Sequence, residues 1–283
     1  MTLEQSNHNI QNKADLGILH LDQILSEWLR SVIPAGIVVA FSGGVDSALV
    51  LYAACRQRSP DDPPVQAVFL RSKLNPSGME SEAKLRAEEW GAIFTVLEFD
   101  EFSISEIANN PPDRCYHCKY TLFSEVINFQ EFCGAAMVLD GTHADDDPDK
   151  RPGMQALQEL GVRSPLRELG MGKKDVRALA SHYGLPMSNK AAAPCLATRV
   201  PYGEFLDQKL LQRIDKSEAA LRELGFFNVR VRAHRDIARI EVDVHQLAEL
   251  VDHRCEILEK LHENGFRYVT LDLEGYRSGS LDE

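Results

Sequence analysis

A polar, glycine-containing loop follows a short and almost wholly apolar segment of the chain. Residues 37–41 read IVVAF, which is typical of a strand buried on both faces of a parallel sheet, and the residues after 47 have a helical composition. The loop between them reads SGGVDS, residues 42–47. A strand, a glycine turn and a helix start together direct several backbone N–H groups, and the positive end of the helix dipole, to one place. The pattern predicts an anion site, although a serine-capped turn would also explain the glycine pair alone.

Each polar position of this loop suits the binding of a phosphate. Gly43 and Gly44 let the backbone approach the ligand closely, whereas Ser42 and Ser47 add hydroxyl donors. Asp46 could hold a magnesium ion or orient the loop. The loop lacks the lysine of the pattern G-x-x-x-x-G-K-[ST], so a phosphoryl-transfer NTPase of that class is not expected.

The composition narrows the class of protein. With 283 residues, of which 44% are hydrophobic, the chain can bury a core and is expected to form two domains of unequal size. The net charge of -12 argues against nucleic acid as a partner, because such binding depends on lysine and arginine meeting phosphates. No apolar run approaches the roughly 20 residues of a transmembrane helix, and the N-terminus does not resemble a leader peptide. We therefore expect a cytoplasmic protein that does not bind a membrane and that acts on a small molecule.

Strand and helix patterns alternate along the first two thirds of the chain. After the first strand, further strands are expected at 65–70, 94–99 and 135–141, and helices at 16–32, 79–91 and 118–132. This alternation predicts an α/β fold with a doubly wound parallel sheet and a ligand beyond the carboxyl ends of its strands. The loop at 42–47 lies at such an end, and so does the pair Asp140-Gly141.

The last part of the chain predicts a smaller α+β domain. It contains helical patterns at 207–224 and 245–264 and strand patterns at 227–233, 237–242 and 267–273. Alternation in the first of these strands places Arg230 and Arg232 on the face opposite Val229 and Val231. We expect a first domain at 1–200 and a second domain at 201–283.

The six cysteines fall into two groups. Cys115 and Cys118 form a C-x-x-C pair at a predicted helix start, a pattern shared by redox pairs, half zinc sites and coincidences. Together with Cys195, they could supply three thiolates to a [4Fe–4S] cluster and leave the fourth iron open for an extra sulfur. The other three lie in apolar patterns and are predicted to be core residues: Cys55, Cys133 and Cys255.

The order of the motifs resembles a known family. SGGVDS matches the PP-loop of the N-type ATP pyrophosphatases, whose fold is of the adenine nucleotide alpha hydrolase-like type. The whole set looks like the LarE family: SGGVDS (42–47), LDG (139–141), RPGMQALQELGVRSPL (151–166), KKDVRALASHYGLP (173–186), NK…PCLATRVPYG (189–203), VRVRAHRDIARIE (229–241) and FRYVTLDLEGYRSGS (266–280).

The resemblance implies an activity and its cofactors. Members of this family are ATP-dependent sulfur transferases, forming AMP and pyrophosphate, in the synthesis of the nickel-pincer nucleotide cofactor. The implied substrate is pyridinium-3,5-biscarboxylic acid mononucleotide, whose carboxylates become thiocarboxylates, and the implied nucleotide is ATP with Mg²⁺. Family members assemble as trimers and hexamers, so a homo-oligomer is also implied.

The same resemblance implies roles for particular residues. Arg230, Arg232 and Arg277 would surround the substrate phosphate, with Glu218 at an acidic position close by. Arg199 would contact AMP or pyrophosphate. Asp146 or Asp147 falls near another acidic position of the family, which leaves open whether the run DDDPDK at 145–150 is a solvated loop or helps to bind a metal.

The source of the sulfur is the main alternative left open. In the well-known branch of the family, a cysteine matching Cys195 gives up its own sulfur and becomes dehydroalanine. That branch has no cysteines matching Cys115 and Cys118, so this chain resembles a three-cysteine subgroup expected to carry the sulfur on a [4Fe–4S] cluster, with its donor unknown. We expect the cluster, with sacrifice of Cys195 as the alternative. Less favoured are a PP-loop thiolase of tRNA, an ammonia-using ligase and a nucleotide- and metal-binding sensor.

Overall fold

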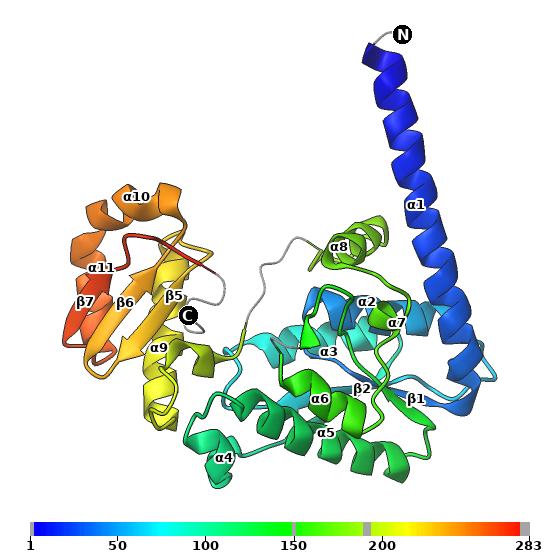
Figure 1. Ribbon diagram of the computed structural model, residues 1–283, viewed down its shortest axis with the longest axis horizontal. Helices are drawn as coiled ribbons and strands as arrows, with labels where there is room; N and C mark the ends of the chain where they lie inside the picture. The colour runs from blue at the N-terminus through cyan, green and yellow to red at the C-terminus, as the bar shows by residue number, and fades with distance from the viewer. Residues whose placement is uncertain (1–2, 149–150, 189–193, 278–283) are drawn as a thin grey trace. The chain divides into compact units, whose positions relative to one another are not determined.

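The computed structural model describes residues 3–148, 151–188 and 194–277 of the chain. These residues form two compact units (Figure 1). Unit 1 is made of Met1–Arg71, Gly78–Phe99 and Cys115–Ala192, and unit 2 of Ser72–Ser77, Asp100–Arg114 and Ala193–Glu283. Each unit has its own sheet, so each is described by itself.

Unit 1 is built on a parallel sheet of four strands. The strands are β1 (Ile37–Ala40), β2 (Gln66–Arg71), β3 (Ile93–Glu98) and β4 (Met137–Leu139), in the order β3-β2-β1-β4. The chain moves outward from β1 to β3 and then returns to place β4 on the other side of β1. The gap between the carboxyl ends of β1 and β4 is therefore the topological switch point, where ligands bind in sheets of this kind. The predicted α/β class and parallel sheet are confirmed.

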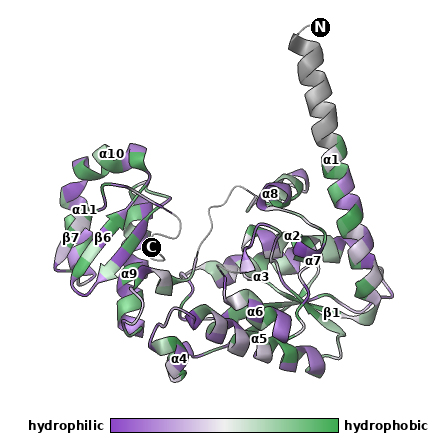
Figure 2. Ribbon diagram, viewed as in Figure 1, coloured by the Kyte–Doolittle hydropathy of each residue, from purple (hydrophilic) through white to green (hydrophobic). Residues whose placement is uncertain are grey.

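Helices cover both faces of this sheet. The helices α1 (Leu3–Val32), α2 (Val45–Gln57), α3 (Met79–Glu89) and α8 (Lys173–His182) contribute to one core with Val39, whereas α5 (Arg114–Phe132) and α6 (Gly153–Glu159) contribute to the other with Val38. Because successive strand residues face opposite cores, β1 is apolar throughout, as its colour in Figure 2 shows. The helix α1 begins well before Leu16, the first residue of the predicted helix.

Unit 2 has a three-stranded sheet in the order β5-β6-β7. The strands β5 (Arg230–His234) and β6 (Ile237–Glu241) form an antiparallel hairpin, and β7 (Tyr268–Leu271) lies parallel to β6. The connection to β7 runs through α10 (Leu247–Asp252) and α11 (Arg254–Glu263), and α9 (Gln208–Glu223) packs against β5. The single helix predicted at 245–264 is wrong, because the backbone leaves helical geometry at His253, with φ -82° and ψ 7°.

Two short segments from the first half of the chain belong to unit 2. The backbone N–H of Leu196 donates to the carbonyl of Leu74 at 2.7 Å, and the N–H of Gly203 donates to the carbonyl of Asn110 at 2.8 Å. The small helix α4 (Ser105–Ala108) lies in the second of these segments, whereas α7 (Pro165–Glu168) belongs to unit 1. The sequence assigned all residues before 201 to the first domain.

Within the described residues, no helix is both long enough and apolar enough to cross a membrane.

Candidate functional site

The loop SGGVDS lies at the carboxyl end of β1 and leads into α2, as its sequence predicted. Gly43 adopts a φ of 77°, a left-handed conformation that glycine accepts without strain. The hydroxyl groups of Ser42 and Ser47 lie 3.2 Å apart, and the Ser42 N–H donates to the Ser47 hydroxyl at 3.2 Å. The first N–H groups of α2 have no carbonyl of their own helix to bind. The loop therefore directs hydroxyl and N–H donors to the switch point of the sheet.

Gly141, at the end of β4, lies directly against this loop. A Cβ atom at Gly141 would come within 2.6 Å of the Ser47 nitrogen and 2.9 Å of the Asp46 carbonyl carbon. These neighbours are backbone atoms and cannot turn aside as a flexible side chain can. Only glycine fits at this position without moving the loop.

Asp140 fixes the chain around Gly141. Its carboxylate accepts hydrogen bonds from the hydroxyl and N–H of Thr142 and from the Ser164 hydroxyl, the last at 2.6 Å. Asp140 is buried, and the carbonyl of Arg163 accepts its backbone N–H at 3.0 Å. The structure therefore uses Asp140 to hold the end of β4 beside the loop.

Lys173 is a charged neighbour of the loop that the sequence reasoning did not assign to the site. It is the first residue of α8, and its ammonium group lies 2.7 Å from each carboxylate oxygen of Asp46. The Lys173 N–H donates to the carboxylate of Asp145, which thereby caps the start of α8. A signal was present in the sequence, since Lys173 opens the motif KKDVRALASHYGLP, residues 173–186.

Residues 145–148 of the acidic run are described by the structure, and one of their three aspartates is buried. Asp146 is buried, accepts the N–H of His143 at 3.0 Å and forms an ion pair with Arg151. Asp145 is exposed but is tied to Lys173. Asp147 is partly buried. These contacts hold the segment after β4 in place near α8.

The C-x-x-C pair lies at the start of α5, as predicted. Cys115 is exposed and Cys118 is partly buried. Residues three apart on a helix share a face, so these two thiols could bind a single metal centre. The start of α6 packs closely here, since a Cβ atom at Gly153 would lie 3.1 Å from the Cys115 carbonyl oxygen.

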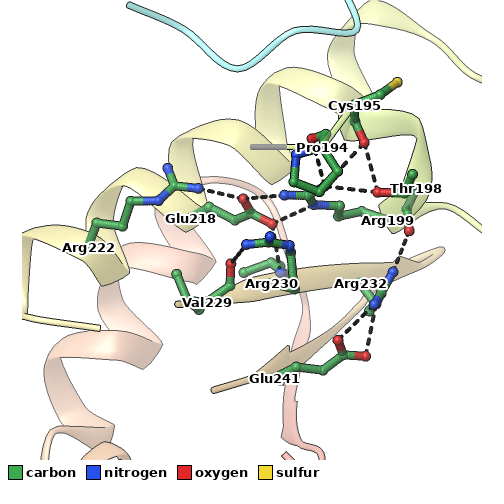
Figure 3. Close-up of polar contacts among 11 residues, drawn as sticks. Pro194, Cys195, Thr198, Arg199, Glu218, Arg222, Val229, Arg230, Arg232 and Glu241 are labelled. Atoms are coloured by element: carbon green, nitrogen blue, oxygen red, sulfur yellow. Dashed lines mark hydrogen bonds and ion pairs between the residues drawn. The ribbon is translucent and has the colours of Figure 1, made fainter. Parts of the chain in front are cut away.

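Cys195 belongs to unit 2, where it immediately precedes a short 3-10 helix at Leu196–Arg199. Its side chain is partly buried. Its carbonyl accepts hydrogen bonds from the Thr198 hydroxyl at 2.8 Å and from the Arg199 guanidinium at 3.1 Å (Figure 3). Thr198 and Arg199 thus hold the backbone of Cys195. Figure 3 shows the sulfur of Cys195 directed away from these contacts.

Arg199 and Glu218 form a buried ion pair beneath Cys195. The Arg199 side chain is 1% exposed and that of Glu218 is 0% exposed, and two guanidinium nitrogens meet the two carboxylate oxygens at 2.8 Å and 3.0 Å. Glu218 also accepts from Arg222 at 2.7 Å and from the Val231 N–H at 3.1 Å. Glu218 therefore connects α9, β5 and the Cys195 turn.

The two arginines of β5, Arg230 and Arg232, are buried, so they do not form a solvent-exposed row on the sheet. Arg232 pairs with both oxygens of Glu241, at 2.8 Å and 2.9 Å, and donates to the Thr198 carbonyl. Arg230 donates to the Val229 carbonyl and lies over the ring of Tyr276, 5.0 Å from its centroid. Burial lowers the pKa of Arg230, and the nearby charge of Arg199 lowers it further.

Arg277 lies in the segment that follows β7. Gly275 packs against the residue that follows β6, since a Cβ atom would lie 2.8 Å from the Val242 carbonyl oxygen, and the Tyr276 N–H donates to that oxygen at 2.7 Å. This anchors Tyr276 over Arg230, and Arg277 is the next residue. Arg277 is exposed and forms an ion pair with Glu274 at 2.6 Å.

The prediction that Cys133 and Cys255 are core residues is wrong, because both are exposed. Cys133 follows the end of α5, and Cys255 lies on an outer face of α11. Cys55 is partly buried and packs against the core of unit 1. Burial raises the pKa of the Cys55 thiol to about 12, so it stays a protonated structural thiol at neutral pH.

Among residues 3–148, 151–188 and 194–277, no three Cys, His, Asp or Glu side chains form a group that could hold a metal ion.

The fold and the loop define the class of protein. A parallel sheet with SGGVDS at its switch point, packed against a glycine at the end of the neighbouring strand, is the arrangement of the PP-loop ATP pyrophosphatase type. No protein-family model matches the chain. The chain is, however, 40% identical over 247 residues to the pyridinium-3,5-bisthiocarboxylic acid mononucleotide synthase of Lactiplantibacillus plantarum, covering 87% of this chain and 89% of that protein. The chain therefore belongs to the LarE family.

Two further relatives carry no functional name. An uncharacterised protein of Synechocystis sp. is 39% identical over 247 residues, which covers 87% of this chain and 91% of the relative. An uncharacterised protein of Methanocaldococcus jannaschii is 28% identical over 242 residues, which covers 86% of this chain and 91% of the relative. In each case the similarity spans both units.

Proposed function

We propose that this protein is an ATP-dependent sulfur transferase that converts the carboxylates of pyridinium-3,5-biscarboxylic acid mononucleotide into thiocarboxylates. The observation that carries the proposal is the similarity to a relative named as the synthase of the bisthiocarboxylic product, extended over most of both chains. The loop at 42–47 and the buried arginines of unit 2 supply matching chemistry. The product would serve nickel-pincer nucleotide synthesis.

The first step is adenylation of a carboxylate. A carboxylate oxygen attacks the α-phosphorus of ATP, and pyrophosphate leaves. The hydroxyls of Ser42 and Ser47 and the N–H groups at the start of α2 are suited to bind the phosphates. Asp46 is suited to serve as a ligand of Mg²⁺, because its carboxylate already binds a cation, the ammonium group of Lys173. Bound Mg²⁺ would offset the charge of the departing pyrophosphate.

The second unit is suited to bind the substrate phosphate. Two buried carboxylates, those of Glu218 and Glu241, lie among five guanidinium groups: those of Arg199, Arg222, Arg230 and Arg232 (Figure 3), and that of Arg239, which also binds Glu241. This leaves an excess of positive charge in a buried region, and the lowered pKa of Arg230 means that an added anion would stabilise its charged form. Arg230 and Arg232, with Arg277, which follows the Tyr276 that lies against Arg230, are therefore proposed to bind the phosphate.

The role of Arg199 is inferred from its contacts. Its guanidinium is occupied by Glu218 and by the carbonyls of Pro194 and Cys195. We infer that Arg199 positions the Cys195 turn. Contact of Arg199 with AMP or pyrophosphate stays a prediction from the sequence.

Sulfur transfer completes the reaction. A sulfur nucleophile attacks the acyl carbon of the adenylate, and AMP leaves. We propose Cys195 as a participant, with Cys115 and Cys118, either as ligands of a [4Fe–4S] cluster or, in the alternative, with Cys195 as the sulfur donor. In that alternative, a thioester forms at Cys195, loss of the Cα proton breaks the Cβ–S bond, and dehydroalanine remains.

Metal analysis separates the two sulfur sources. After anaerobic purification, we expect about four irons per chain in the wild type, lost in Cys115→Ala, Cys118→Ala and Cys195→Ala. Cys133→Ala is the matched control, since Cys133 is an exposed cysteine outside the proposed set, and it should keep its iron. Iron-free protein that still thiolates its substrate once, with loss of H₂S mass from Cys195, would contradict the cluster and support the sacrificial reaction.

Pyrophosphate release tests the adenylation step. With ATP and Mg²⁺, we expect release that depends on the pyridinium dicarboxylate mononucleotide and is absent with a pyridinium mononucleotide that has no carboxylates. Equal release with both compounds would argue against carboxylate activation. A tRNA mobility shift by this acidic chain would instead favour the thiolase of tRNA. A homo-oligomer and a cytoplasmic location stay predictions from the sequence.

A further inference from the structure

We propose that Lys173 is a phosphate-binding residue of the nucleotide site, held by Asp46 while no nucleotide is bound and transferred to the nucleotide phosphates on binding. This inference rests on the proposed use of ATP at the loop of residues 42–47. It concerns a residue to which the sequence motifs assign no role.

The position of Lys173 is determined by the end of β4 as well as by α8. The segment after β4 holds the start of α8 through two contacts: the Ala144 N–H donates to the Met171 carbonyl at 2.8 Å, and Asp145 accepts the Lys173 N–H. From there the side chain reaches the first turn of α2, where its ammonium group meets both oxygens of Asp46 at 2.7 Å. Lys173 thus brings a positive charge from a third segment to the glycine loop.

Stability alone is a weak explanation for this ion pair. The side chains of Lys173 and Asp46 are 32% and 27% exposed, and ion pairs open to solvent contribute only about 0–1 kcal/mol. By contrast, the loop has a chemical need for a cation. The loop itself contains no lysine, because SGGVDS lacks the lysine that ends the G-x-x-x-x-G-K pattern.

Exchange of partners keeps the charges balanced. The negative Asp46 and the positive Lys173 neutralise one another beside the N–H groups of α2. When a nucleotide arrives with a divalent cation, Asp46 can bind the cation, and the ammonium group of Lys173 can then bind a phosphate oxygen. No covalent change is involved, and the flexible four-carbon stem of lysine allows the movement.

Calorimetric titration of the full-length protein with ATP and, separately, with adenosine tests this role. In the presence of Mg²⁺, Lys173→Met should weaken ATP binding by about tenfold or more, the loss expected for a charge-assisted hydrogen bond. Adenosine binding should be unchanged, because adenosine has no phosphates. Lys173→Arg should recover part of the ATP affinity. The matched control is Lys174→Met, which removes an exposed lysine from the next position and should bind ATP like the wild type.

Thermal unfolding first establishes that each variant is folded, and Lys173→Gln replaces the methionine variant if that one is not. Unchanged ATP affinity in a folded, uncharged variant would overturn the inference. An equal loss of ATP and adenosine binding would also overturn it, since that result means the ion pair only shapes the loop. Failure of the wild type itself to bind ATP would instead overturn the proposed function.

Discussion

Replacing Gly141 with alanine should disable the nucleotide site. The added Cβ atom would meet the Ser47 nitrogen at 2.6 Å and the Asp46 carbonyl carbon at 2.9 Å, so the first turn of α2 or the end of β4 must move. Overpacking of this kind costs about 1–3 kcal/mol of unfolding free energy. Movement of the loop also misplaces the donors that would bind phosphates, so we expect ATP affinity to fall by about tenfold or more.

Calorimetry with ATP and urea denaturation measure the two effects of Gly141→Ala. The control is Gly17→Ala, the same substitution at an exposed position in α1 where a Cβ atom has no neighbour within 4 Å. It should leave ATP affinity unchanged, and its stability should be equal or slightly higher, because alanine favours a helix over glycine. Wild-type ATP binding and stability in Gly141→Ala would show that the nucleotide does not depend on this close packing.

Replacing Glu218 with glutamine should strongly destabilise unit 2. The carboxylate has hydrogen-bonded contacts with Arg199 and Arg222 and with the Val231 N–H, and it is 0% exposed. The neutral amide leaves the Arg199 charge buried without its counter-ion and turns one acceptor into a donor that faces guanidinium groups. Removing one partner of a buried pair costs about 3–5 kcal/mol. The Cys195 turn should loosen as well, because Arg199 binds its carbonyl.

Chemical denaturation measures the loss in Glu218→Gln. Glu223→Gln, at an exposed position of the same helix, is the control and should change stability by less than about 0.5 kcal/mol. The double variant Arg199→Met, Glu218→Leu should lose less than the sum of its two single variants, since neither member of this ion pair is then buried without the other. A Glu218→Gln protein as stable as the wild type would contradict the buried ion pair.

The sequence predicted features that depend on neighbouring residues. The apolar run before SGGVDS, the glycines within it and the helix after it determine a strand, a turn and a helix start locally, so the loop could be predicted. The C-x-x-C pair at the start of α5 could be predicted for the same reason. The resemblance to a family, which the alignment confirms, extended these local signals to the whole chain.

Features that depend on distant segments could not be predicted. The pair Lys173–Asp46 joins residues 127 positions apart, and the contact of Gly141 with the loop requires β4 to lie beside β1. Alternation correctly separated Arg230 and Arg232 from the valines of β5, but their burial follows from α9, which packs on that strand with Glu218. Cys133 was misread because apolar neighbours in the sequence do not ensure burial: Phe132, the residue before it, is exposed as well.

The most direct test of the central claim is mass spectrometry of the small-molecule product. The protein is incubated with ATP, Mg²⁺ and pyridinium-3,5-biscarboxylic acid mononucleotide, with a sulfide source present and absent. We expect substrate in which carboxylate oxygen has been replaced by sulfur, with AMP formed in step, and no such product without ATP or with Cys195→Ala. Recovery of unmodified dicarboxylate, from wild-type protein that binds ATP, would contradict the assignment as a sulfur transferase of this substrate.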